Sequence, residues 1–135
     1  MSRPPDAFST VQRVRFGDLD AMQHMNNVEF LRFFETARID YIRQLMPGHH
    51  PGDRAQFGFI FAECHINYRA PVHYDQQVGI SCSVSDVARS SFRVPFEMHV
   101  DTRLVAEGYG VLVGFDYTRE RAMPLPDALR ERLTS

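Results

Sequence analysis

The feature that most constrains the fold is one long helical pattern followed by four strand-like runs, with no second long helix between them. Residues 27–45 carry apolar side chains at helical spacing, and Pro47 and Gly48 then end the pattern. The strand-like runs cover about residues 58–68, 76–86, 91–100 and 104–116. The last two connections are only a few residues long, which favours antiparallel hairpins. The chain is therefore expected to be an α+β protein with one helix packed against an antiparallel sheet.

The predicted helix has one narrow polar side and one wide apolar side. The polar stripe consists of Glu29, Arg32, Thr36, Asp40 and Arg43, and the apolar arc of Phe30, Leu31, Phe34, Ala37, Tyr41, Ile42 and Leu45. A helix this apolar is expected to be largely covered by the rest of the protein. Arg38 falls within the apolar arc, three residues after Glu35. We expect these two residues to form a buried or half-buried ion pair, because an unpaired charge there would be costly.

Further elements are expected at both ends and within the strands. Residues 11–16 predict a first short strand, residues 126–133 a short final helix, and residues 1–9 a flexible leader. Alternation along 58–68 places Ile60, Ala62, Cys64, Ile66 and Tyr68 on one face, opposite Phe59, Phe61, Glu63, His65 and Asn67. Ala106, Gly108, Gly110, Leu112 and Gly114 share a face of the last run. Such small residues allow a helix backbone to lie close to the sheet.

Length and charge narrow the class of protein. A chain of 135 residues fits a single domain, spanning 1–135, with a core of its own. The net charge is −2, and the sequence contains no block of basic residues, so nothing indicates nucleic-acid binding. No apolar stretch approaches the roughly 20 residues of a membrane span, and no signal peptide pattern opens the chain. These features predict a cytoplasmic protein without membrane attachment, in which Cys64 and Cys82 are free thiols.

The segment between the first strand and the long helix carries the most chemistry. It reads Asp-Leu-Asp-Ala-Met-Gln-His-Met-Asn-Asn over residues 18–27. A carboxylate just ahead of a helix start can drive attack on a carbonyl, while the helix's free N–H groups hold the developing oxyanion. The simpler alternative is an acid that only stabilises a turn. Asn26 or Asn27 is a suitable N-cap.

This segment closely resembles the signature of the hotdog-fold acyl-CoA thioesterases of the 4-hydroxybenzoyl-CoA thioesterase superfamily. Members of that superfamily read Asp-x-x-Gly-His-Val-Asn-Asn or Asp-x-x-Gln-His-Val-Asn-Asn there. The resemblance runs from residue 11 to residue 133, including Glu35-Thr-Ala-Arg38 and Asn67-Tyr-Arg-Ala-Pro71. It implies a hotdog domain, with the antiparallel sheet wrapped around one long central helix. It also implies hydrolysis of an acyl or aroyl thioester to the free acid and thiol, with no cofactor.

The resemblance also implies roles for individual residues. Asp20 corresponds to the catalytic acid, which acts as a nucleophile or as a general base on water. The backbone N–H of Asn27 corresponds to the donor that polarises the thioester carbonyl. His24 matches a histidine of the related plant acyl-carrier-protein thioesterases, but Met22 stands where those enzymes carry an asparagine. The role of His24 is therefore either direct hydrogen bonding or ordering of the loop, and Asp18 is expected to support the loop through backbone N–H groups.

Other residues are candidates for binding the carrier. Arg89, Ser90 and Ser91 lie in a turn that often meets coenzyme A in the family, and Arg69 could also meet its phosphates. A solvated turn is the simpler reading of the first three. The expected partners are an acyl-CoA or acyl-carrier-protein thioester and further copies of the chain. Hotdog subunits normally pair as homodimers or homotetramers, with sites at the dimer interface.

Two other functions remain open from the sequence. One is a hotdog hydratase or dehydratase acting on enoyl thioesters, although such enzymes place their acid and histidine differently. The other is a non-catalytic acyl-CoA sensor, in which Asp20 would be dispensable. The six histidines show no metal-binding spacing, so no metal site is expected. There is no Gly-x-Ser-x-Gly element of a serine hydrolase.

Overall fold

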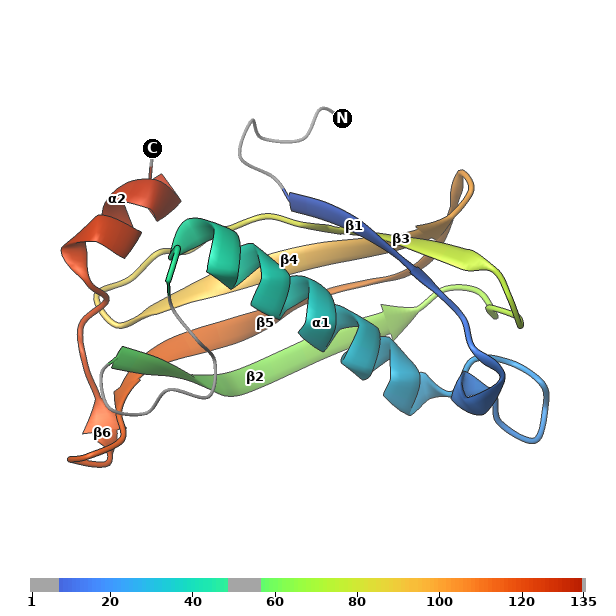
Figure 1. Cartoon of the computed structure of the whole chain (residues 1–135), viewed down its shortest axis with the longest axis horizontal. Helices are drawn as coiled ribbons and strands as arrows, with labels where there is room; N and C mark the ends of the chain where they lie inside the picture. The colour runs from blue at the N-terminus through green and yellow to red at the C-terminus, as the bar shows by residue number, and fades with distance from the viewer. Residues whose placement is uncertain (1–7, 49–56, 135) are drawn as a thin grey trace.

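The computed structural model describes residues 8–48 and 57–134, which form an antiparallel sheet and two α-helices (Figure 1). The elements are β1 (Phe8–Arg13), a 3-10 turn η1 (Phe16–Asp18), α1 (Asn27–Leu45), β2 (Phe57–Tyr68), β3 (Gln77–Cys82), β4 (Ser91–Val100), β5 (Arg103–Asp116), β6 (Arg121–Ala122) and α2 (Asp127–Thr134). Within this part of the chain the strand order is β1-β3-β4-β5-β2, and β6 pairs with the end of β5. Helix α1 lies across one face of the sheet (Figure 1). Neither helix is long and apolar enough to cross a membrane.

The predicted helix and most strands are confirmed, with differences at the first and third strands. Helix α1 covers residues 27–45, as predicted, and β4 covers residues 91–100. Strand β3 ends at Cys82, four residues earlier than predicted. Strand β1 begins at Phe8 rather than residue 11, and the ring of Phe8 stacks on Tyr41 with centroids 5.6 Å apart. The flexible leader was therefore predicted too long by two residues, and its residues 1–7 lie outside the described part of the chain.

Strand β2 does not keep one alternating pattern along its length. Its pairing with β5 changes register between Phe61 and Glu63, where Ala62 is an extra residue in a β-bulge. Before the bulge, Phe57, Phe59 and Phe61 pack against the core, and after it Cys64 and Ile66 do so. The predicted division of this strand into two faces is therefore wrong, because a one-residue shift exchanges the faces.

The small residues of β5 make room for aromatic rings and for a neighbouring strand. A Cβ added at Gly108 would collide with the carbonyl of His65 on β2. One added at Gly110 would meet the rings of Phe61 and Phe34. The sequence correctly indicated a close approach at these positions, but the groups that approach are β2 and aromatic side chains, not the helix backbone.

The core lies between α1 and the sheet. Phe34 is fully buried and stacks on Phe96 of β4, with ring centroids 4.1 Å apart. Arg38 is also covered, with 11% of its side chain exposed, and its guanidinium lies 3.8 Å from the centre of the Phe61 ring. Its Nη2 is 3.9 Å from Glu35 Oε2, which confirms the predicted pair. Leu31 was predicted within the apolar arc but is 40% exposed.

Candidate active site

The motif loop, residues 19–26, is closed on itself and held against the rest of the protein by backbone hydrogen bonds. Leu19 and Met25 form an isolated antiparallel bridge. The N–H of Met25 donates to the carbonyl of Val72 at 2.7 Å, and the N–H of Asn26 donates to the carbonyl of Asp18 at 2.9 Å. The loop therefore has a defined position directly ahead of α1.

Asp18 is a structural acid, buried with 4% of its surface exposed. Its carboxylate accepts from the backbone N–H of Arg15 at 2.8 Å and from the Arg15 guanidinium at 3.0 and 3.2 Å. Burial alone would raise the pKa of Asp18, but the hydrogen bonds and charge of Arg15 outweigh it and leave the pKa below its usual value of 3.8. Asp18 was predicted to support the loop by accepting backbone N–H bonds, and its carboxylate accepts one such bond, from Arg15 just before the loop.

Replacing Asp18 with asparagine is expected to lower the free energy of unfolding at pH 7 by about 1–3 kcal/mol, because charge-assisted hydrogen bonds are lost at a buried group. A depressed folded-state pKa means that this stabilisation is complete above pH 3.8 and is lost as the pH falls through the folded-state pKa. Urea unfolding at several pH values between 7 and 2 measures both effects. The difference between wild type and variant should therefore shrink in the most acidic samples.

Asp75→Asn is the matched control, because its ion pair with Arg13 (2.7 Å) is largely exposed and is expected to contribute little to stability. An Asp18→Asn variant no less stable than Asp75→Asn would contradict a structural role for the Asp18 carboxylate.

Asp20 lies on the exposed side of the motif loop. Its Oδ1 accepts from the backbone N–H groups of Met22 at 2.9 Å and His24 at 3.3 Å. Its own backbone N–H donates to the carbonyl of His24 at 2.9 Å. The tight turn between them places Gln23 at a φ of +63°. The carboxylate is thus held by two backbone amides, and the residue is exposed.

His24 is half-buried beside a second histidine. Its ring meets that of His73 edge-on, with centroids 5.3 Å apart. His73 comes from the connection between β2 and β3, the same segment whose Val72 carbonyl holds the loop. The backbone of His24 bonds to Asp20 in both directions, so this residue contributes to the shape of the loop around the acid.

The start of α1 leaves one amide without an acceptor. Asn26 is the N-cap, and its side chain accepts from the N–H of Val28 at 3.0 Å. The N–H of Glu29 donates to the Asn26 carbonyl at 2.8 Å. The N–H of Asn27 has no acceptor among residues 8–48 and 57–134. It is therefore available to a ligand at the positive end of a 19-residue helix.

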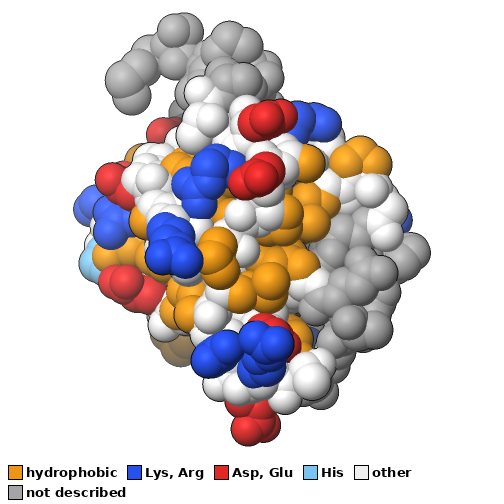
Figure 2. Space-filling model, turned by 90° about the vertical axis from the view of Figure 1, so that its left-hand side faces the viewer, with side chains coloured by type: hydrophobic (Ala, Val, Ile, Leu, Met, Phe, Trp, Pro, Cys, Tyr) orange, Lys and Arg blue, Asp and Glu red, His pale blue; other side chains and the backbone are white. Residues whose placement is uncertain are grey.

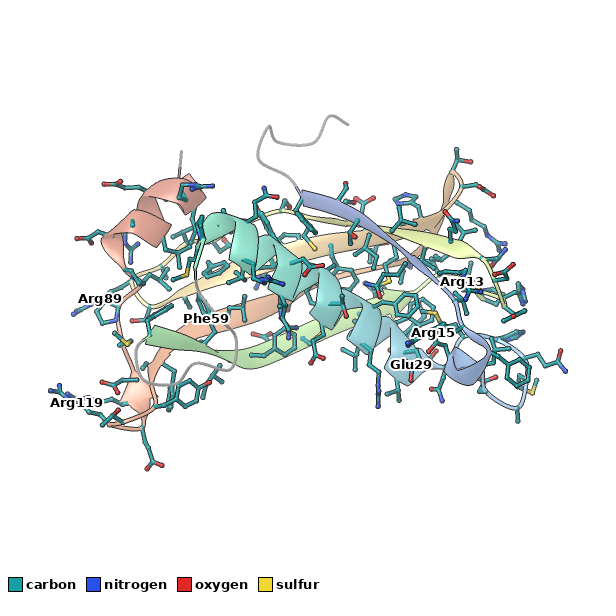
Figure 3. All side chains as sticks on the ribbon, in the orientation of Figure 1. Arg13, Arg15, Glu29, Phe59, Arg89 and Arg119 are labelled. Carbon is teal, nitrogen blue, oxygen red and sulfur yellow. The ribbon has the colours of Figure 1, made fainter. Side chains whose placement is uncertain are left out.

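The turn that contains Arg89, Ser90 and Ser91 lies far from this loop within one chain. Arg89 is at the opposite end of the molecule from Arg15 and Glu29 (Figure 3). The carbonyl of Arg89 accepts from the N–H of Leu125, and the carbonyl of Ser90 from that of Gly114. Viewed from this end, hydrophobic side chains are gathered in the middle, with arginine and acidic side chains around them (Figure 2). A single chain does not bring this turn to Asp20.

Arg69, in contrast, follows directly on Tyr68 at the end of β2. Its Nε donates to Glu107 Oε2 at 2.9 Å, in a half-exposed ion pair. Its backbone N–H donates to the carbonyl of Val105. The guanidinium is therefore already partnered by a carboxylate, which any phosphate would have to share or displace.

The family of the chain follows from comparison with known proteins. The family model described as the thioesterase-like superfamily matches residues 14–133, which include the whole motif loop and both α-helices up to residue 133. The chain belongs to this superfamily. The resemblance to the hotdog-fold acyl-CoA thioesterases is thereby confirmed, and this superfamily member is a thioester hydrolase.

Individual relatives agree with the assignment to the thioesterase-like superfamily. The long-chain acyl-CoA thioesterase FadM of Escherichia coli (strain K12) is 27% identical over 128 residues, covering 90% of this chain and 92% of that protein. A thioesterase from Thermus thermophilus, solved in complex with coenzyme A and Zn, is 32% identical, with a TM-score of 0.83 over 93% of this chain and 90% of that one. A 1,4-dihydroxy-2-naphthoyl-CoA thioesterase from Synechocystis shares the fold, with a TM-score of 0.85, 15% identity and coverage of 94% and 95%.

In the part of the chain that the structure describes, no three His, Cys, Asp or Glu side chains lie together in a way that could hold a metal ion. Cys64 and Cys82 are free thiols, as predicted, and burial raises the pKa of Cys82 to about 12. His49 and His50 lie outside the described residues.

Two neighbours of the motif loop in this thioesterase were not singled out from the sequence. One is His73 beside His24, and the other is Tyr68, whose hydroxyl donates to the carbonyl of Asn27 at 3.2 Å. Both residues are more than 40 positions away from their partners in the sequence, so local patterns do not predict these contacts. The sequence signal for Tyr68 was its place in the segment Asn67-Tyr-Arg-Ala-Pro71.

Proposed function

We propose that this protein hydrolyses an acyl-CoA or aroyl-CoA thioester, with Asp20 as the reacting carboxylate and the N–H of Asn27 as an oxyanion donor. The observation that carries the proposal is the motif loop itself. It holds Asp20, which is exposed and bound by two backbone amides, in the loop directly ahead of a helix whose first N–H has no acceptor among the described residues. The names of the relatives support a coenzyme A thioester as the substrate.

Hydrolysis forms a C–O bond at the thioester carbonyl carbon and breaks its C–S bond. Asp20 either attacks this carbon directly or takes a proton from the water that attacks it. The C–S bond then breaks. In the general-base route the departing thiolate takes the proton that Asp20 removed from water, and in the direct route it takes a proton from the solvent. If Asp20 attacks directly, water cleaves the resulting anhydride and restores the carboxylate. Negative charge grows on the carbonyl oxygen in both routes, so a preorganised N–H donor accelerates both.

His24 completes the loop around this acid. Because its backbone bonds to Asp20 on both sides, it is expected to keep the carboxylate in place. We assign it this ordering role, with its imidazole and that of His73 bordering the site.

We infer that a second copy of the chain completes the site. Strand β2 is an edge of the sheet, and an edge strand offers unpaired N–H and carbonyl groups to another strand. A two-fold pair joined antiparallel through β2 brings the Phe57 end of one strand to the Tyr68 end of the other. The Arg89–Ser91 turn of the second copy then lies toward the motif loop, where it and Arg69 are candidates for the carrier phosphates. A homodimer or homotetramer is expected.

The domain organisation, the cellular compartment and the acyl group complete the proposal. We take residues 1–135 as one hotdog domain, with the sheet wrapped around α1, acting in the cytoplasm. The acyl group is left open, because the relatives named above act on substrates as different as long-chain acyl-CoA and 1,4-dihydroxy-2-naphthoyl-CoA.

Thiol release from a panel of acyl-CoA and aroyl-CoA thioesters tests the proposal. The panel should span short and long alkyl chains and hydroxylated aromatic acids, with an acyl-carrier-protein thioester for comparison. We expect saturable turnover with at least one member. Tight binding of every thioester without thiol release would favour the sensor instead, and addition of water to an enoyl-CoA would favour the hydratase.

A further inference from the structure

Tyr68, the last residue of β2, connects the sheet to the first turn of α1. Its hydroxyl donates to the carbonyl of Asn27 at 3.2 Å, across 41 positions of sequence. Its ring meets that of Phe30 edge-on, with centroids 5.2 Å apart. Phe30 is buried, whereas 43% of Tyr68 is exposed. The ring is therefore seated on the core while its hydroxyl reaches the surface at the start of the helix.

The hydroxyl is a dependable donor in this position. Burial, with a smaller contribution from Cys64, raises the pKa of Tyr68 above its usual value of 10. The phenol therefore keeps its proton throughout the neutral range.

The other contacts of this helix start come from the motif loop. Asn26 caps the Val28 amide, and its own N–H is bound by the carbonyl of Asp18. These bonds fix the helix start relative to the loop that carries Asp20. The bond from Tyr68 fixes the same residue, Asn27, relative to the sheet. Loop, helix start and strand thus meet at Asn27, whose N–H has no acceptor among residues 8–48 and 57–134.

We propose that Tyr68 is a positioning residue of the thioesterase site, which holds the first turn of α1 so that the Asn27 N–H points at the substrate oxygen. The inference rests on the proposed function, because it gives Tyr68 a role through the oxyanion donor. Tyr68 reacts with nothing itself. Its hydroxyl restrains the Asn27 residue on its carbonyl side, and the cap at Asn26 restrains it on its amide side.

Tyr68→Phe removes only the hydroxyl and keeps the ring on Phe30. We expect kcat to fall about two- to ten-fold, the range that one net hydrogen bond supports, with KM changed by less than about two-fold. The matched control is Tyr109→Phe, which loses a hydroxyl bond of the same 3.2 Å length, to Glu63, between β5 and β2 away from the motif loop. Its kcat should equal that of the wild type.

A double-mutant cycle separates positioning from a general structural effect. The Asn27→Pro variant lacks the backbone N–H through which Tyr68 is proposed to act. Adding Tyr68→Phe to this variant should therefore lower kcat no further. A purely structural role would lower kcat by the same factor in both backgrounds. Thermal unfolding of all variants checks that the folded fraction is equal.

Non-additive losses support the positioning role. Additive losses, or a Tyr68→Phe enzyme with wild-type kcat while Asp20→Asn is inactive, overturn it and leave the proposed function standing. A wild-type protein that releases no thiol from any thioester overturns both.

Discussion

Replacing Asp20 with asparagine is expected to lower kcat for thioester hydrolysis about 10²–10⁴-fold, the range typical for loss of a positioned acid–base group. Asparagine suits this test because its side-chain oxygen can still accept from the N–H groups of Met22 and His24. The motif loop should therefore keep its shape while the carboxylate loses its ability to attack or to take a proton. Steady-state thiol release with the best acyl-CoA of the panel measures the effect.

Asp18→Asn is the matched control for this experiment. It is the same substitution two residues earlier, at an acid that is buried against Arg15. It should reduce stability while retaining most of the turnover at a temperature where it is folded. An Asp20→Asn enzyme within about three-fold of wild type would rule out the proposed chemistry, since general-base or nucleophilic catalysis is worth far more than that.

Replacing Asn27 with proline is expected to lower kcat about 10²–10³-fold, which corresponds to about 2.7–4 kcal/mol for one oxyanion donor. Proline removes the backbone hydrogen and leaves the carbonyl that accepts from Tyr68. Asn27 is the first residue of α1, the helical position where proline is favoured. The preceding Asn26 has a ψ of 139°, which a residue before proline readily adopts. The helix should therefore form normally.

Asn27→Ala controls for the lost side chain, because it keeps the N–H and should retain most of the wild-type kcat. Circular dichroism and thermal unfolding confirm that α1 is intact in both variants. If Asn27→Pro is folded and turns over at the rate of Asn27→Ala, the oxyanion donor is a different group.

Local patterns predicted the elements of this fold well. The wide apolar arc of residues 27–45, followed by Pro47 and Gly48, predicted α1 with the bounds it has in the structure. Short connections between apolar runs predicted the hairpins of β3, β4 and β5. The strand order was not predicted, since periodicity alone does not say which strands are neighbours, and the family resemblance was used only for a sheet wrapped around the helix. The bulge at Ala62 was missed because residues 59–62 are all apolar, so the sequence does not show where the alternation changes phase.

The candidate site was only partly predictable. The sequence pointed to Asp18, Asp20 and Asn27 because they lie within ten residues of one another at a helix start. Acids and N-cap residues at such a place can be identified from the sequence alone. Tyr68 and His73 reach that place from another part of the chain, and the family segment that contains Tyr68 does not by itself show which residues it contacts. Arg89 was grouped with the site by resemblance, but its turn is bound to the C-terminal segment at the other end of the molecule.

The extra residue at Ala62 also bears on how related chains can differ in length. Strand β2 pairs with β5 in two registers, one for residues 57–61 and one for residues 63–68. Adding or deleting one residue in either half turns aromatic side chains out to water and brings Glu63 and His65 inward. We therefore expect length changes among related chains to fall in the turns, such as the one at Asp101 and Thr102. An alignment of homologues is expected to show fewer gaps inside β2 than in these turns.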